Sequence, residues 1–146
     1  MLTAYHQAFQ ASRWCERPRV NLAWYVQAAE TEEEARAMAR GSDHWFIETF
    51  MRGRNIPFPS DKTVAAATYT PTEHMAIAMR RQYAIVGTAE QVVDGLNTLQ
   101  RQTHADELTL VTIPSDPKAR LASYALIAAA SSLNGSSSPT GSPSSD

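Results

Sequence analysis

The sequence predicts an α/β fold in which parallel strands alternate with helices. Three apolar runs rich in β-branched and aromatic residues, at 20–28, 83–86 and 108–113, are each followed by a helix-start signal. A helix between two strands returns the chain to the same end of the sheet, so successive strands run parallel through right-handed crossovers. The length of 146 residues is enough for one domain with one core.

The first half of the chain is expected to contain a short helix, a strand and a long helix. A helix end occupies roughly the first ten residues. The run VNLAWYVQA at 20–28 has no charged residue, as is typical of a strand covered on both faces. Thr31 followed by Glu34 forms a capping box, which predicts a helix over about 32–52. The glutamates in its first turn favour the positive end of the helix dipole.

The long helix is expected to bury its aromatic residues, and a loop is expected after it. Trp45, Phe46 and Phe50 share a stripe at helical spacing, which indicates packing rather than a cofactor cleft. Between Gly53 and Thr70, two prolines exclude a central strand or a helix interior. A loop of this length is usually functional or mobile.

The second half contains three more helix starts. Thr70 and Glu73 form a capping box with proline at the first helical position, and Thr88 and Gln91 form another directly after a strand. Residues 116–117 open the last helix. Its inward face is expected to carry Leu121, Tyr124, Ala125 and Ala128.

Residues 133–146 are predicted to be a disordered tail. They read LNGSSSPTGSPSSD, and beyond Leu133 they offer no large apolar side chain to offset the backbone entropy lost on ordering. Residues 1–132 are therefore expected to form the folded domain.

Composition excludes several function classes. The net charge of -2 provides no field for nucleic acid, and no apolar run approaches the roughly 18 residues of a membrane helix. Cys15 is the single cysteine and the first residues lack the pattern of a secretory signal, so a reducing cytoplasm is expected.

Few residues point to chemistry. The four histidines are scattered, with no neighbouring ligands at metal-binding spacing, so no metal site is expected. No G-x-S-x-G elbow and no glycine-rich phosphate loop occurs. The turn at Gly87 and Thr88 is the best candidate, because a helix start after a strand offers N–H groups to an anion. Gly87 is expected to need a positive φ there, since a strand reverses into a helix within two residues.

Four segments in order resemble the C-terminal part of the luciferase-like flavin-dependent monooxygenases. The second to fourth are close to that family's usual text, with Glu30 and Ala89 as departures from its aspartate and proline. The segments are Tyr5…Phe9…Ser12, VQAAETEEEAR at 26–36, YAIVGTAEQVVDGL at 83–96 and ADELTLVTIPSDPKARLASYALIA at 105–128.

The resemblance implies the C-terminal portion of a (β/α)8 TIM barrel. A whole barrel needs roughly 250 residues, so residues 1–132 would supply about strands six to eight with their helices. Trp24 and Leu110 would then belong to a barrel-facing layer without partners. Barrel enzymes build their sites at the carboxyl ends of the strands, here 27–28, 87–88 and 114–115.

The family uses reduced FMN, or in some branches a deazaflavin, and its monooxygenases react the flavin with oxygen to oxidise a small organic substrate. The resemblance assigns no catalytic residue to this chain. It implies that Gly87 and Thr88 line the flavin pocket, and that a fragment of this kind is inactive alone.

Two other readings remain open from the sequence. The chain could be a non-catalytic remnant or partner subunit that self-associates through exposed sheet edges. It could also be a complete small α/β domain of open, flavodoxin-like kind.

Overall fold

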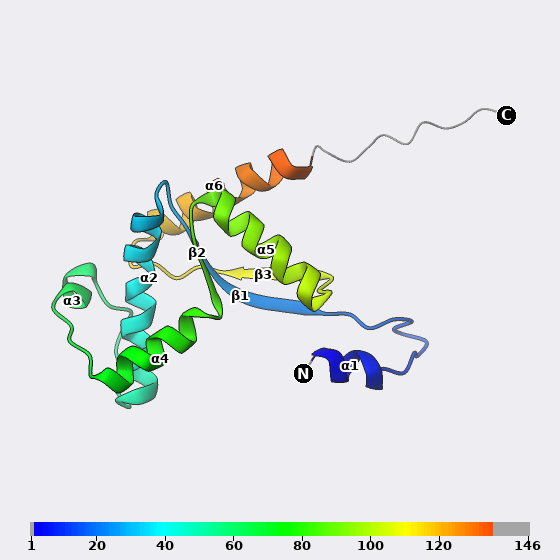
Figure 1. Cartoon of the computed structure of the whole chain (residues 1–146), viewed down its shortest axis with the longest axis horizontal. Helices are drawn as coiled ribbons and strands as arrows, with labels where there is room; N and C mark the ends of the chain where they lie inside the picture. The colour runs from blue at the N-terminus through cyan, green and yellow to red at the C-terminus, as the bar shows by residue number, and fades with distance from the viewer. Residues whose placement is uncertain (1, 136–146) are drawn as a thin grey trace.

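The structure is a computed structural model that describes residues 2–135, with side chains up to residue 131 (Figure 1). The predicted tail at 136–146 lies outside the described residues, whereas residues 133–135 continue the last helix. None of the described helices is long and apolar enough to span a bilayer. In chain order the elements are α1 (Leu2–Ala8), β1 (Asn21–Ala28), α2 (Glu32–Phe46), the π-helix η1 (Ile47–Met51), α3 (Asp61–Ala65), α4 (Pro71–Arg81), β2 (Ala84–Gly87), α5 (Ala89–Thr103), β3 (Glu107–Val111) and α6 (Pro117–Gly135).

The three strands form one parallel sheet, as the alternation of strands and helices predicts. β1 lies in the centre and is longer than either neighbour, so each neighbour pairs with a different half of it. Residues 25–28 pair with β2 at 84–87, and residues 21–25 pair with β3 at 107–111. The mixed α/β class is therefore confirmed.

The strand order β2-β1-β3 differs from the order expected of three consecutive barrel strands. In a barrel of βα repeats each strand lies beside the next one in sequence, so the second of three would be central. Here the first strand is central, and the assignment of the three strands to barrel positions six, seven and eight in succession is wrong. β2 and β3 pair with opposite edges of β1, so strands that follow each other in the sequence are not neighbours in the sheet.

One face of the sheet is covered by α5 and α6, which pack against each other and against the strands (Figure 1). The core on this face contains Val26, Ala28, Val92, Val93 and Ile127. Trp24 and Leu110 pack against this cluster. Both were expected to face a barrel interior, so this expectation is corrected: period-2 alternation places them with Val26, on the helix side.

The opposite face of the sheet is only half covered. α2 packs over the carboxyl half of β1 and over β2. Four side chains near the amino ends of β1 and β3 stay exposed on this face, Asn21, Ala23, Glu107 and Thr109. Parallel sheets are almost always covered on both faces, so a half that the described residues leave bare is unusual for this kind of sheet.

The long helix forms as predicted, but its aromatic residues do not all lie on the buried face. Thr31 and Glu34 make the capping box, and the helix ends in the π-helix η1, where the Arg52 amide donates to the Ile47 carbonyl at 3.0 Å. The wider turn shifts the residues after it around the helix axis. Ile47 is fully buried and Phe50 is 67% exposed, so the prediction that Phe50 lies on the buried face is wrong.

Two more predictions are corrected in the second half. The segment 53–70 is not wholly a loop, because Ser60 caps the one-turn helix α3. The inward face of α6 carries Ser123, Leu126 and Ile127, whereas the predicted inward residues Leu121, Tyr124, Ala125 and Ala128 are exposed. Apolar residues lie on both faces of α6, so spacing alone could not choose between them.

Candidate functional site

The carboxyl ends of the strands meet under α2 and α6, and polar side chains complete their backbone hydrogen bonds. Ser123 Oγ accepts from the Ala28 amide at 2.9 Å, and Thr112 Oγ1 donates to the Val26 carbonyl at 2.8 Å. The fully buried Gln27 donates through Nε2 to the Ala28 carbonyl at 3.2 Å, and its Oε1 has no partner among the described residues. Beyond the end of β3, these two side-chain hydroxyls thus make the hydrogen bonds that the backbone of a neighbouring strand would make with β1.

The turn at Gly87 and Thr88 is occupied by its own capping box. The Thr88 amide donates to Gln91 Oε1 at 2.9 Å, and Thr88 Oγ1 accepts from the Gln91 amide. Gly87 is buried and its φ is not positive, so the expected left-handed backbone is absent from this turn. A Cβ at Gly87 would lie 2.3 Å from Gln91 Oε1, so a larger residue there would displace the Gln91 side chain from its capping box. At Thr88, the N–H that would bind an anion is already used.

The turn after β3 joins a different part of the chain. Ser115 Oγ donates to Asp61 Oδ1 at 2.7 Å, which ties this turn to α3. The predicted strand-end residues 27–28, 87–88 and 114–115 are not among the lining residues of the two cavities described below.

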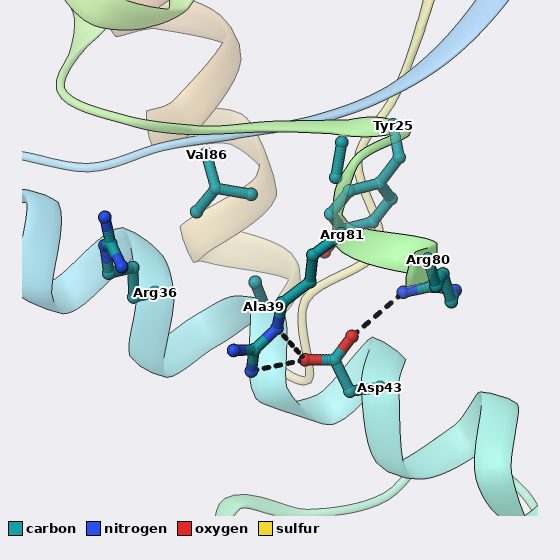
Figure 2. Close-up of a pocket in the computed structure, with 8 residues that line it drawn as sticks. Tyr25, Arg36, Ala39, Asp43, Arg80, Arg81 and Val86 are labelled. Atoms are coloured by element: carbon teal, nitrogen blue, oxygen red, sulfur yellow. Dashed lines mark hydrogen bonds and ion pairs between the residues drawn. The ribbon is translucent and has the colours of Figure 1, made fainter. Parts of the chain in front are cut away.

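A cavity of about 180 Å³ lies between the sheet and the helices α2 and α4 (Figure 2). Asp43, one of the residues that line this cavity, is 3% exposed and accepts hydrogen bonds from two arginines. Oδ1 of Asp43 accepts from Arg80 at 3.1 Å, and Oδ2 accepts from Arg81 at 2.9 Å and 2.7 Å. Arg80 also donates to Ser42 Oγ at 2.6 Å. The lining residues are Tyr25, Arg36, Ala39, Asp43, Arg80, Arg81, Ala84 and Val86.

Tyr25 brings a buried hydroxyl from β1 to this cavity. Its oxygen lies near Ser42 but makes no hydrogen bond of good geometry with any described residue. Burial raises the pKa of Tyr25 to about 12, against the opposing influence of the Arg80 charge. The Tyr25 hydroxyl therefore keeps its proton over the whole physiological range.

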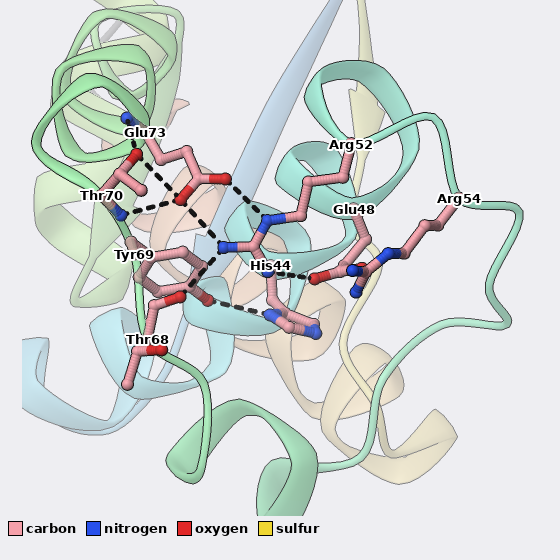
Figure 3. A network of polar contacts seen from close by, with 8 residues as sticks. All are labelled: His44, Glu48, Arg52, Arg54, Thr68, Tyr69, Thr70 and Glu73. Atoms are coloured by element: carbon pink, nitrogen blue, oxygen red, sulfur yellow. Dashed lines mark hydrogen bonds and ion pairs between the residues drawn. The ribbon is translucent and has the colours of Figure 1, made fainter.

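A second polar network joins η1 to α4 (Figure 3). Arg52 donates to Glu73 at 2.6 Å and 2.9 Å and to Glu48 at 2.6 Å, and Arg54 donates to Glu48 at 3.0 Å. The Arg52 hydrogen bonds and the Thr70 amide lower the pKa of Glu73 to about 2. His44 Nδ1 lies 3.0 Å from the Tyr69 hydroxyl beside this network. Each carboxylate is matched by a guanidinium, so the network fastens α4 to η1.

Sequence reasoning missed both clusters. Their members come from segments more than twenty residues apart, so no local motif links them. One signal was available: Asp43 and Glu48 are charged residues among the inward positions of an apolar helix, and buried carboxylates need partners.

A wider cavity of about 790 Å³ lies between α2 and α3. Met38, Val64 and Tyr69 are among its lining residues, together with His74. In the part of the chain that the structure describes, no three His, Cys, Asp or Glu side chains come close enough to hold a metal ion.

Comparisons with known proteins relate the chain to parts of longer proteins. No family model matches it. The uncharacterized protein YwcH of Bacillus subtilis is 35% identical over 127 residues, which cover 84% of this chain and 37% of YwcH. The luciferase-like monooxygenase of Escherichia coli strain K12 is 25% identical over 125 residues, covering 86% of this chain and 37% of that protein.

The crystal structure of apo-MsnO8 resembles this chain with a TM-score of 0.77 and 27% identity, over 90% of this chain and 40% of that one. The chain thus spans little more than a third of the length of the curated relatives it matches. These findings establish a distant similarity to part of proteins named luciferase-like monooxygenase.

Proposed function

We propose that residues 1–132 are the C-terminal part of a luciferase-like, flavin-dependent oxidoreductase with a (β/α)8 barrel. The observation that carries the proposal is the half-bare sheet, in which Asn21, Ala23 and Thr109 face solvent on a surface that parallel sheets normally cover. The match to only 37% of the length of the luciferase-like relatives supports it, because their remaining residues would be available to cover this face.

Within this proposal β1 and β3 are consecutive strands of the barrel wall. They pair over five residues, and α5 and α6 cover the face that would point outward. β2 pairs only with the carboxyl half of β1, so we assign it as a short extra strand at the mouth of the barrel. This assignment replaces that of three wall strands in succession.

We propose that the whole protein uses reduced FMN, with a deazaflavin as the alternative, and a small organic substrate. The flavin would supply the reaction with oxygen, and the protein would bind and orient it. We propose that the described residues do not form a flavin site alone. The Thr88 amide is taken by Gln91, and the cavity beside Asp43, of about 180 Å³, is smaller than the roughly 300–1,000 Å³ of typical ligand sites. The cavity of about 790 Å³ between α2 and α3 is large enough, but no strand residue is among its lining residues. Gly87 and Thr88 can then contribute only contact surface to the flavin pocket, and we assign no catalytic residue here.

A chimera tests this proposal. The 127 residues of YwcH that match this chain are replaced by residues of this chain, and FMN binding is followed by flavin fluorescence beside intact YwcH and chain 1–146. If the proposal holds, intact YwcH and a soluble chimera should both bind FMN, and chain 1–146 should show no tight binding. An insoluble chimera, or a monomeric chain 1–146 that binds FMN at low micromolar concentration, contradicts the proposal.

A second candidate is a non-catalytic partner that associates through sheet edges. The outer edges of β2 and β3 have no strand partner among the described residues, which favours it. It predicts a stable dimer of chain 1–146 in size-exclusion chromatography and a chimera that fails to bind FMN. A self-sufficient flavodoxin-like domain shares the order 2-1-3 but would not leave half of one sheet face bare.

A further inference from the structure

We propose that the arginine-lined cavity between β2, α2 and α4 binds a small oxyanion, a phosphate or carboxylate group. The proposal rests on the side chains around this cavity and not on the flavin chemistry proposed above. All three arginines line the cavity, and Figure 2 shows Arg81 and Arg80 reaching Asp43, with Arg36 farther along α2.

The side chains that line the cavity carry a net positive charge. Three guanidiniums line the cavity and Asp43 is the single carboxylate among its lining residues. Arg80 and Arg81 share Asp43 between them, so one positive charge is left over. Arg36 pairs with Glu32, which lies outside the lining. An anion in the cavity would therefore meet an uncompensated guanidinium charge, and hydrogen bonds between two charged groups are stronger than those between neutral groups.

Two of the arginines that line the cavity keep N–H groups that no other described residue uses. Arg81 holds Asp43 through Nε and Nη2, and Arg36 holds Glu32 through Nε and Nη2. Nη1 of both arginines makes no hydrogen bond with any residue in the range 2–135. Both Nη1 groups are therefore free to donate to an oxyanion that enters the cavity.

The cavity is also of a size that fits one oxyanion group. Ala39, Ala84 and Val86 form the apolar part of the lining and leave room beside the arginines. The volume of about 180 Å³ is several times the roughly 30 Å³ of one water molecule. It suits one oxyanion group but not a larger organic molecule.

The test is titration of chain 1–146 with inorganic phosphate, followed by calorimetry, with circular dichroism as a check on folding. Arg81→Gln and Arg36→Gln should each weaken binding about tenfold, since hydrogen bonds to charged groups are the stronger class. The matched control is Arg101→Gln on α5, an exposed arginine that contacts only Thr98. It makes the same change in net charge and should alter affinity less than twofold.

A variant that binds phosphate more tightly is informative because misfolding cannot produce a gain in affinity. Glu32→Gln frees the Arg36 guanidinium from its exposed partner and should tighten phosphate binding several-fold. Phenyl phosphate distinguishes the source of the anion: tighter binding than phosphate identifies an organic ester whose body stays outside, and weaker binding identifies the free ion. Absence of binding at millimolar phosphate, or equal losses in Arg101→Gln and Arg81→Gln, overturns the proposal. Flavin binding by the chimera is unaffected by either outcome, so the two proposals fail separately.

Discussion

Replacing Gly95 with alanine tests how closely α5 is packed onto β2. A Cβ at Gly95 would lie 2.7 Å from Ile85 Cγ2, 3.3 Å from Cδ1 and 3.4 Å from Cγ1. Alanine improves helix propensity by about 1 kcal/mol over glycine, while overpacking a core contact costs about 1–3 kcal/mol. Cγ2 is branched from the β-carbon of a strand residue and cannot swing aside, so we expect a net loss of about 1 kcal/mol.

The same change should reverse its sign when Ile85 is shortened. Ile85→Ala removes all three contacting atoms, so Gly95→Ala in that background keeps only the propensity gain of about 1 kcal/mol. The double-mutant cycle then gives a coupling of about 2 kcal/mol. Free energies of unfolding come from urea denaturation, and Asn97→Ala, exposed on the same helix, should stabilise by about 0.5 kcal/mol. If Gly95→Ala stabilises both backgrounds equally, the close approach of α5 to β2 is refuted.

Two further predictions concern buried polar groups. Ser123→Ala should destabilise the fold by about 1–3 kcal/mol in urea denaturation, because the Ala28 amide loses its acceptor inside the core, whereas Ser131→Ala on an exposed part of α6 should change little. Glu73 has a pKa lowered from 4.5 to about 2 by Arg52, so its contribution to stability is complete above about pH 4.5 and is lost as the pH falls toward 2. The loss of stability between pH 5 and 2 should be smaller in Glu73→Gln, and an unchanged pH profile would contradict the Arg52–Glu73 pairing.

Local signals in the sequence predicted what local interactions decide. The boxes at Thr31, Thr70 and Thr88 all form with their predicted partners, because a capping box needs only residues three positions apart. The strands were placed within one or two residues for the same reason. The flavin contacts of Gly87 and Thr88 stay a prediction.

Long-range pairing was not predictable from the same signals. The order of the strands depends on which edge of β1 each short strand meets, and nothing near Ala84 or Glu107 encodes that edge. Phe50 was misplaced because a π-turn changes the helical period that the stripe assumed. The cluster around Asp43 requires α2 and α4 to be brought together, so its site appears only in three dimensions.

The two proposals concern the two halves of one face of the sheet. Tyr25 lies on the same side of β1 as Asn21 and Ala23, because side chains alternate along a strand, so the anion cavity and the bare half share a face. If the rest of a barrel stands against the bare half, the cavity lies beside the carboxyl half of β1, toward the end of the barrel where such enzymes build their sites. Hydrogen exchange distinguishes the halves. In the YwcH chimera, amides of residues 107–111 that point to the open edge should exchange more slowly than in chain 1–146, because a neighbouring strand would pair with them. Amides of residues 25–28, already paired with β2 or capped by Ser123, should exchange alike in both proteins. Equal exchange at 107–111 in the two proteins would mean that no strand covers that edge, and the barrel would have to be abandoned.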